Sequence, residues 1–161
     1  MGITITDTML PQAYPFIAFS MFVLGACIGS FLNVVICRLP QHQSIIWPPS
    51  RCPECGHQLS ALENIPVLSW LFLKARCRKC KNPISIRYPL IELTVACLFA
   101  AIWVRTVQAD LPLVFLPGLL FFTTALLAAA VIDVQHGVIP NKITYTGFIA
   151  ALLAALLIPA S

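Results

Sequence analysis

Four cysteines carry the clearest chemistry in this 161-residue chain. They form two Cys-x-x-Cys pairs, Cys52 with Cys55 and Cys77 with Cys80, and 21 residues separate the pairs. Paired thiolates at such a spacing are typical of a tetrahedral zinc site. His57, two residues after Cys55, competes as a ligand, but the symmetric spacing favours the cysteines. We therefore predict one Zn²⁺ ion bound by the four cysteines.

Two carboxylates stand at the edges of apolar segments. Asp133 follows 22 uncharged residues, and Glu92 lies a few residues inside another apolar segment. A carboxylate within a membrane is costly and is usually functional. For Glu92, a functional role and pairing with a loop arginine are equally good interpretations. Taken alone, Asp133 is better explained as a helix end that faces water.

Membrane helices are needed to position these groups, because the chain is too apolar for a soluble domain. Charged residues make up 10% of it and hydrophobic residues 59%, whereas a soluble domain carries about a quarter charged residues. A helix needs roughly 20 apolar residues to cross a bilayer. We predict an all-α polytopic membrane protein with about four transmembrane helices, at residues 16–37, 89–107, 113–132 and 143–158. The first is not a cleaved signal peptide, since no basic residue precedes it.

The basic residues indicate the orientation. Eight of the ten lie in one polar segment, residues 38–88, and basic residues concentrate in cytoplasmic loops. This predicts a cytoplasmic zinc-knuckle loop and an N-terminus outside. The net charge of +4 then reflects topology, and nucleic-acid binding is the weaker explanation. Thiols stay reduced in the cytoplasm, which favours a metal site over disulfides.

The sequence divides into three regions. Residues 1–37 hold an N-terminal segment and the first helix, residues 38–88 the tetracysteine domain, and residues 89–161 the later helices with Asp133. The middle region contains six prolines and few aliphatic residues, so zinc coordination is expected to replace a hydrophobic core. Its apolar run at residues 65–73 is too short to span a bilayer, and Trp70 places it at the interface or against the knuckle.

Small and polar residues in the first helix suggest close packing. Gly25 and Gly29 are spaced to let another helix approach. Asn33 follows one turn later and needs a hydrogen-bond partner, either as packing or as a contact in a substrate groove. The remaining cysteines are interpreted as small membrane-packing residues: Cys27, Cys37 and Cys97.

Longer motifs surround these residues in a fixed order. They are Gly25-x-x-x-Gly29-Ser-Phe-Leu-Asn-Val-Val-Ile-x-Arg38-Leu-Pro40, Arg51-Cys-Pro-x-Cys55, Asn64-Ile-Pro-x-x-Ser-Trp70-Leu, Arg76-Cys-x-x-Cys80-x-x-x-Ile-Ser-x-Arg-Tyr-Pro-x-x-Glu92 and Ile132-Asp133-x-x-x-x-x-Ile-Pro140-Asn141-x-x-Thr144. Together they resemble the type IV prepilin peptidases, the leader peptidase and N-methyltransferase enzymes of type IV pilus and type II secretion systems. The resemblance covers nearly the whole chain.

The resemblance implies a reaction at the cytoplasmic face of the bacterial inner membrane. Such enzymes cleave the leader of a prepilin or pseudopilin and methylate the new N-terminus with S-adenosylmethionine. Cleavage uses two aspartates, of which Asp133 matches the first. One carboxylate acts as base on water while the other, protonated, polarises the scissile carbonyl. The implied partners are prepilins and membrane lipid, without nucleic acid, and the S-adenosylmethionine residues stay unassigned.

The chain departs from the family pattern in one respect. A second aspartate, in a Gly-x-Gly-Asp motif, should follow the first, and no aspartate follows Asp133. We therefore expect a C-terminally truncated chain that does not cleave prepilin alone. One alternative is an inactive or methyltransferase-only homologue that acts as a membrane zinc-binding module. Another is a membrane-anchored zinc-knuckle interaction module, in which Asp133 is only a helix terminus.

Overall fold

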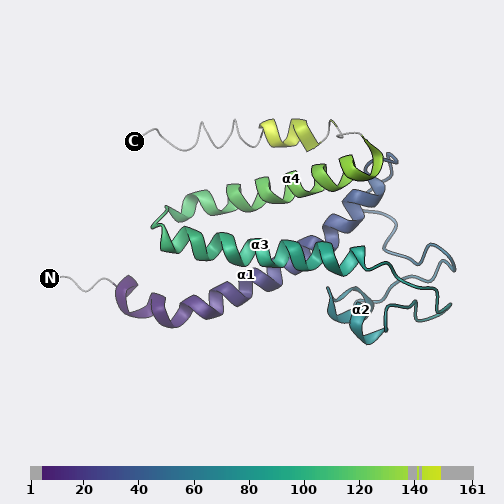
Figure 1. The fold of residues 1–161 in the computed structure, drawn as a ribbon, viewed down its shortest axis with the longest axis horizontal. Helices are drawn as coiled ribbons and strands as arrows, with labels where there is room; N and C mark the ends of the chain where they lie inside the picture. The colour runs from purple at the N-terminus through teal and green to yellow at the C-terminus, as the bar shows by residue number, and fades with distance from the viewer. Residues whose placement is uncertain (1–4, 138–140, 142, 150–161) are drawn as a thin grey trace.

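The computed structural model describes residues 5–137, 141 and 143–149 of the chain (Figure 1). Within these residues every named element is helical, which confirms the predicted all-α class. The elements are α1 (Ile5–Arg38), η1 (Leu62–Asn64), α2 (Leu68–Phe72), α3 (Arg87–Gln108), η2 (Leu113–Phe115) and α4 (Leu116–His136).

Three helices in the described residues are long and apolar enough to cross a membrane. They cover Tyr14–Arg38, Arg87–Gln108 and Leu113–His136. Three predicted spans are therefore confirmed, with ends that move by a few residues. Of the fourth, residues 143–149 are helical and residues 150–158 lie outside the described part of the chain.

Two glycines let α1 approach α3 to backbone contact. A Cβ atom added to Gly29 would lie 2.7 Å from the Cα atom of Glu92, and one added to Gly25 would lie 2.7 Å from the carbonyl oxygen of Val95. A side chain at either position would force the helices apart. The small-residue packing predicted for this helix is therefore confirmed.

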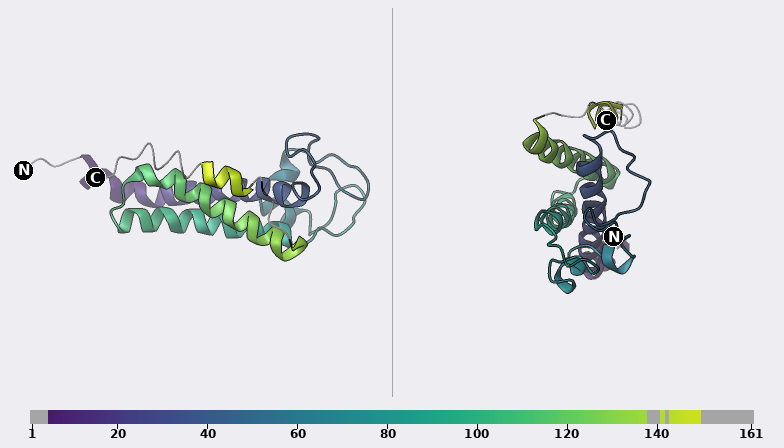
Figure 2. Two further views of the ribbon diagram at one scale, coloured as in Figure 1. Left: turned by 90° about the horizontal axis from the view of Figure 1, so that it is seen from above. Right: turned by 90° about the vertical axis from the view of Figure 1, so that its right-hand side faces the viewer.

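The buried core continues from this contact toward one end of the helices. Its members recur three or four positions apart along each helix, as one helical face requires. They are Leu32 and Ile36 of α1, Ile91, Val95 and Phe99 of α3, and Ala128 and Ile132 of α4. α4 lies across the other two and is the least covered (Figure 2): only 11% of its most apolar window is buried, against 39% in α3. Within the described residues, most of its surface is therefore uncovered.

The end of α4 is set by backbone geometry. Gly137 adopts a left-handed conformation with φ 65°, and its N–H donates to the Asp133 carbonyl at 2.7 Å. This geometry ends a helix at a glycine. The last turn of α4, the end of α1 and the start of α3 meet at the same end of the molecule, from which the tetracysteine loop projects (Figure 1).

Candidate functional site

The four predicted ligands meet in one cluster within the loop. The Sγ atoms of Cys52 and Cys80 are 3.8 Å apart, and those of Cys55 and Cys77 are 3.9 Å apart. All four sulfurs lie within 4.8 Å of one another. A Zn–S bond of about 2.3 Å with tetrahedral angles separates two sulfurs by about 3.8 Å. The four thiols therefore fit a zinc ion, and an all-sulfur tetrahedral set favours zinc.

Each cysteine pair lies on a turn built by the same backbone hydrogen bonds. The first cysteine's carbonyl accepts from the N–H of Gly56 in one turn and of Lys81 in the other, both at 3.0 Å. Its N–H donates to the carbonyl of His57 or Asn82, both at 2.8 Å. The turns are copies offset by 25 residues, which the Arg-Cys-x-x-Cys text at positions 51 and 76 indicates. Our reading of the sequence missed this local repeat.

The second turn directs backbone N–H groups at sulfur. The N–H groups of Cys80 and Lys79 lower the pKa of the Cys77 thiol to about 6. At Cys80 the Asn82 N–H lowers the pKa, but burial and the neighbouring thiols together raise it to about 12. Four adjacent thiols cannot all ionise without a cation between them. A bound metal ion would therefore have to displace the remaining protons.

The alternative ligand, His57, pairs with an acidic residue. Its Nε2 atom lies 3.3 Å from both carboxylate oxygens of Glu63. Glu63 is buried and also accepts hydrogen bonds from the Ser60 N–H at 2.9 Å and the Ser60 hydroxyl at 2.8 Å. These Ser60 bonds, followed by the smaller effect of His57, hold the pKa of Glu63 below its ordinary value. His57 thus contacts Glu63 beside the first turn, which is consistent with the prediction that the four cysteines, and not His57, bind the metal.

A buried carboxylate fastens the loop to α3. The Oε2 atom of Glu92 accepts the Val67 N–H at 2.7 Å. Val67 has φ 60° and ψ −51°, and the next residue's N–H bonds to the Pro66 carbonyl, so the chain makes a strained γ-turn. Of the two interpretations of Glu92, the geometry supports structural pairing. Its partners are the Val67 N–H and the Ser30 side chain, and in the described part of the chain the loop arginine named in the sequence interpretation does not pair with it.

The apolar run at residues 65–73 forms α2 and packs against the second turn. The Trp70 Nε1 atom donates to the Ile84 carbonyl at 3.0 Å. The other face of α2 is exposed. The predicted packing against the knuckle fits the face of α2 that carries Trp70. The predicted place at a membrane interface is compatible with the opposite, exposed face.

Asn33 contacts the start of α3. Its Nδ2 atom donates to the Tyr88 carbonyl at 3.1 Å, while its buried Oδ1 atom has no partner among the described residues. Nearly all buried polar atoms are hydrogen-bonded, so helix packing alone does not explain this residue. The three isolated cysteines are exposed on the helix surfaces, outside the described helix contacts: Cys27, Cys37 and Cys97.

The predicted catalytic carboxylate lies at the same end of the helices as the loop. Asp133 is exposed in the last turn of α4, directly after the fully buried Ile132. The Nη1 atom of Arg87 donates to the Gln135 Oε1 atom at 2.8 Å, which ties this turn to the first residue of α3. Within the described residues no cation lies within ion-pair distance of Asp133. Its catalytic role stays a prediction.

Comparison with known proteins bears on this arrangement. The family model described as the bacterial peptidase A24 N-terminal domain matches residues 23–106, which contain the four cysteines and Glu92 but not Asp133. Proteins named prepilin leader peptidase/N-methyltransferase are similar: one from Myxococcus xanthus is 47% identical over 93% of this chain and 44% of its own length, and one from Bacillus subtilis is 42% identical over 86% and 54%. A third from Aeromonas hydrophila is 37% identical over 84% and 54%.

The chain thus spans about half the length of the curated relatives it matches. No solved structure matches it. The matched family model covers just over half of the chain and includes the last part of α1, the whole tetracysteine loop and nearly all of α3. This protein belongs to the prepilin leader peptidase/N-methyltransferase family, through its bacterial peptidase A24 N-terminal domain.

Proposed function

We propose that this chain is the N-terminal part of a prepilin leader peptidase and N-methyltransferase of a type IV pilus or type II secretion system. Relatives that carry that name support the proposal. The observation that carries it is the position of Asp133, exposed at the end of a membrane-spanning helix and on the same side as the tetracysteine loop. A carboxylate there is placed to meet a peptide bond that emerges from the membrane.

The proposed organisation keeps three regions. Residues 1–37 form the N-terminal segment and first helix, residues 38–88 the zinc-binding domain, and residues 89–161 the helices with the first aspartate motif. Eight of ten basic residues lie in the middle region, which supports a cytoplasmic loop and an N-terminus outside, in a bacterial inner membrane. A reporter fused at residue 60 and found outside the cell would contradict this topology.

The proposed cleavage needs two carboxylates with different protonation states. One takes a proton from water as that water attacks the scissile carbonyl, and the other, protonated, polarises the carbonyl oxygen and then supplies a proton. Asp133 is one of the pair. The second would come from a segment in which a further membrane-edge aspartate faces Asp133. Prepilins or pseudopilins are the proposed substrates.

The tetracysteine domain is proposed to hold Zn²⁺ through Cys52, Cys55, Cys77 and Cys80. Sulfur separations of 3.8 and 3.9 Å support this ligand set. In the complete enzyme, the domain would position the substrate for methyl transfer from S-adenosylmethionine, because it projects beside the end of the helices where the new amine would emerge. The residues that bind S-adenosylmethionine are not assigned.

The role of Asp133 is tested by prepilin cleavage. The chain would be co-expressed with a segment that carries a second membrane-edge aspartate. Asp133→Asn should abolish processing, because an amide neither accepts a proton from water nor shares one. Asp110→Asn is the matched control, since Asp110 is also exposed but lies beyond the opposite end of α3. If residues 1–161 alone process a prepilin, the two-carboxylate mechanism is wrong for this protein.

A pre-cleaved pilin separates the two proposed reactions. It supplies the amine directly, so Asp133→Asn should still methylate it, whereas the double variant Cys77→Ser with Cys80→Ser should methylate it poorly. The opposite result, in which the cysteine variant methylates and the Asp133 variant does not, would reverse the assigned roles. No methylation by any form, with normal metal content, would leave the chain a zinc-binding membrane module.

A further inference from the structure

The helix α2 presents its apolar side chains outward. Leu68, Leu71 and Phe72 occupy positions i, i+3 and i+4, so they share one helical face. They are 49%, 56% and 82% exposed. A short helix on a soluble loop would normally turn such a face inward, because contiguous exposed apolar surface marks an interaction site.

Two contacts fix the orientation of this face. At the start of α2, the Val67 N–H is held by Glu92, which lies in the second turn of membrane-spanning α3. On the opposite face of α2, the Trp70 indole donates to the Ile84 carbonyl. The short helix therefore lies beside the first turns of α3, one of the helices long and apolar enough to cross a membrane (Figure 1).

Basic residues line a pocket that starts at the end of α2. Its volume is about 330 Å³, and its walls include Phe72 and Leu73 together with Lys74, Arg76, Arg78 and Lys81. The remaining lining residue is Cys77, one of the proposed zinc ligands, and no aspartate or glutamate lines the pocket. The four cations are exposed and outnumber this one thiol, and none of the four forms an ion pair in the described part of the chain. An apolar wall that continues into a positive pocket complements the acyl chain and phosphate of an anionic phospholipid.

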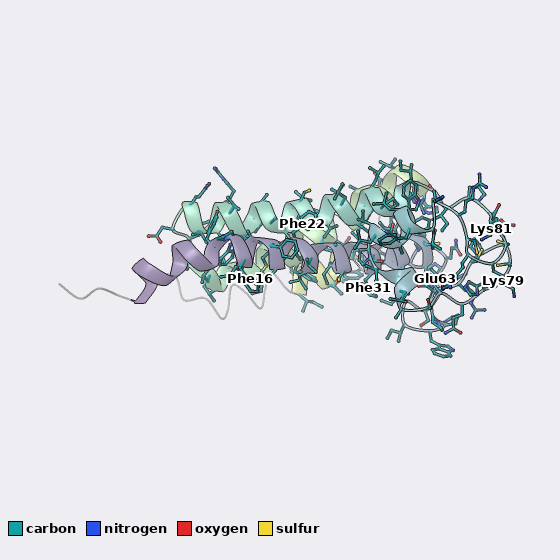
Figure 3. The ribbon with its side chains drawn as sticks, turned by 90° about the horizontal axis from the view of Figure 1, so that it is seen from below. Phe16, Phe22, Phe31, Glu63, Lys79 and Lys81 are labelled. Carbon is teal, nitrogen blue, oxygen red and sulfur yellow. The ribbon has the colours of Figure 1, made fainter. Side chains whose placement is uncertain are left out.

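We propose that α2 and this pocket form a docking surface for anionic phospholipid. Leu68, Leu71 and Phe72 enter the acyl region at the membrane surface. Lys74 and Arg76, which follow α2 most closely in sequence, contact the headgroup phosphate. Lys79 serves as a contrast because it does not line the pocket, although Figure 3 shows it, like Lys81, at the far end of the loop from the helices.

This surface gives the loop a fixed height above the membrane. Zinc and the γ-turn make the loop rigid, and lipid contact at α2 would add a second attachment besides the helix ends. The inference does not depend on the proposed peptidase reaction, since it needs only a membrane next to α3.

Native mass spectrometry can measure the interaction on zinc-loaded chain 1–161 in detergent with added phosphatidylglycerol or phosphatidylcholine. The test variant is Lys74→Gln with Arg76→Gln. A basic residue near an anionic surface contributes about fivefold in affinity, so two should contribute about 25-fold. We expect that loss for phosphatidylglycerol and little change for phosphatidylcholine.

The matched control is Arg51→Gln with Lys79→Gln. It removes the same charge from the same loop, and Arg51 occupies in the first turn the place that Arg76 has in the second. Its affinity for phosphatidylglycerol should fall less than threefold. An equal loss in both double variants would mean diffuse loop charge and would overturn the proposal. Zinc content and circular dichroism show that each variant is folded.

Two further measurements separate lipid from other anions. Phe72→Trp should be quenched by brominated acyl chains more strongly than the parent protein, and no added quenching would overturn insertion of α2. Inorganic phosphate should not displace phosphatidylglycerol at millimolar concentration. Displacement would instead indicate a site for a soluble phosphate compound and would also contradict the lipid surface.

Discussion

The contact between α1 and α3 and the tetracysteine loop are held together by opposite means. Between the helices, Gly25 and Gly29 remove side chains so that backbones touch, and apolar packing does the rest. In the loop, side chains that belong in a core are mostly absent or exposed, and four thiols converge instead. The comparison shows close backbone packing between helices apolar enough to span a membrane, and a cluster of thiols that could hold a metal ion in the polar loop.

The two regions meet at a few polar contacts. Glu92 holds the Val67 N–H, and Asn33 holds the Tyr88 carbonyl. The first contact joins α3 to the loop, and the second joins α1 to the first turn of α3, where the loop ends. A substitution in one region should therefore leave the other region folded, unless it removes one of these contacts. The following predictions test whether the helices and the loop are independent in this sense.

Loss of the metal should have the largest effect. Structural zinc contributes roughly 10–16 kcal/mol of apparent binding free energy in small metal domains. Cys77→Ser, or a strong chelator, should remove zinc and abolish hydrogen-exchange protection of the loop amides while α1 and α3 stay protected. Cys97→Ser is the control, because Cys97 is exposed on α3. Full loop protection without metal would contradict the assignment of a structural role to zinc.

A methyl group in the helix contact should come next. Gly29→Ala places a Cβ atom 2.7 Å from the Glu92 Cα atom, and overpacking typically costs about 1–3 kcal/mol. Gly118→Ala is matched, since nothing lies within 4 Å of its added Cβ atom. Thermal unfolding in detergent should show a lower midpoint for the first variant only. Equal midpoints would mean that the helices are not in backbone contact.

The contact between the two regions should be broken by Glu92→Ala. The Val67 N–H then loses its acceptor, and an unsatisfied buried donor costs about 1–3 kcal/mol. Hydrogen exchange at Val67 should accelerate and α2 should loosen, with zinc content unchanged. Glu92→Gln keeps a side-chain oxygen and should show a smaller effect. If Glu92→Ala loses zinc as well as the Val67 hydrogen bond, the metal site depends on the attachment of the loop to α3.

The smallest expected effect is a change in zinc affinity when one residue is substituted in each cysteine turn. Gly56 and Lys81 both have positive φ, 68° and 62°, a conformation that costs a residue with a side chain roughly 1–2 kcal/mol. Gly56→Ala should weaken zinc binding by about tenfold, and Lys81→Gly should strengthen it by a similar or smaller factor. Competition with a chromogenic chelator measures both. Stronger zinc binding by Gly56→Ala, or weaker binding by Lys81→Gly, would mean that the two turns are not equivalent.

Much of the fold could be predicted from residue types. Runs of about 20 apolar residues must form helices in lipid, because every backbone group has to be bonded within the segment. The predicted span at residues 113–132 is confirmed, but its helix continues to His136. A charge marks where lipid ends, whereas a helix ends where its hydrogen bonds do, here at Gly137.

The candidate site divides in the same way. Spacing alone indicated the four cysteines, because two residues between thiols suit a turn around a metal. Spacing did not indicate that the sulfurs of Cys52 and Cys80 lie 3.8 Å apart, since that depends on how the two turns face each other. It also could not show the acceptor role of Glu92 toward Val67, because that partner is a backbone group.

The apolar helices, the four proposed metal ligands and the glycine contact could be predicted from the sequence, since each depends on local composition or short spacing, and the family from the resemblance of its ordered motifs. Only the tertiary structure decided which groups meet across the chain: Val67 with Glu92, and Arg87 with Gln135. It also decided that the apolar face of α2 points outward beside a basic pocket. The physical reason is that hydrophobicity fixes which residues leave water, whereas directional hydrogen bonds and close backbone packing fix their partners.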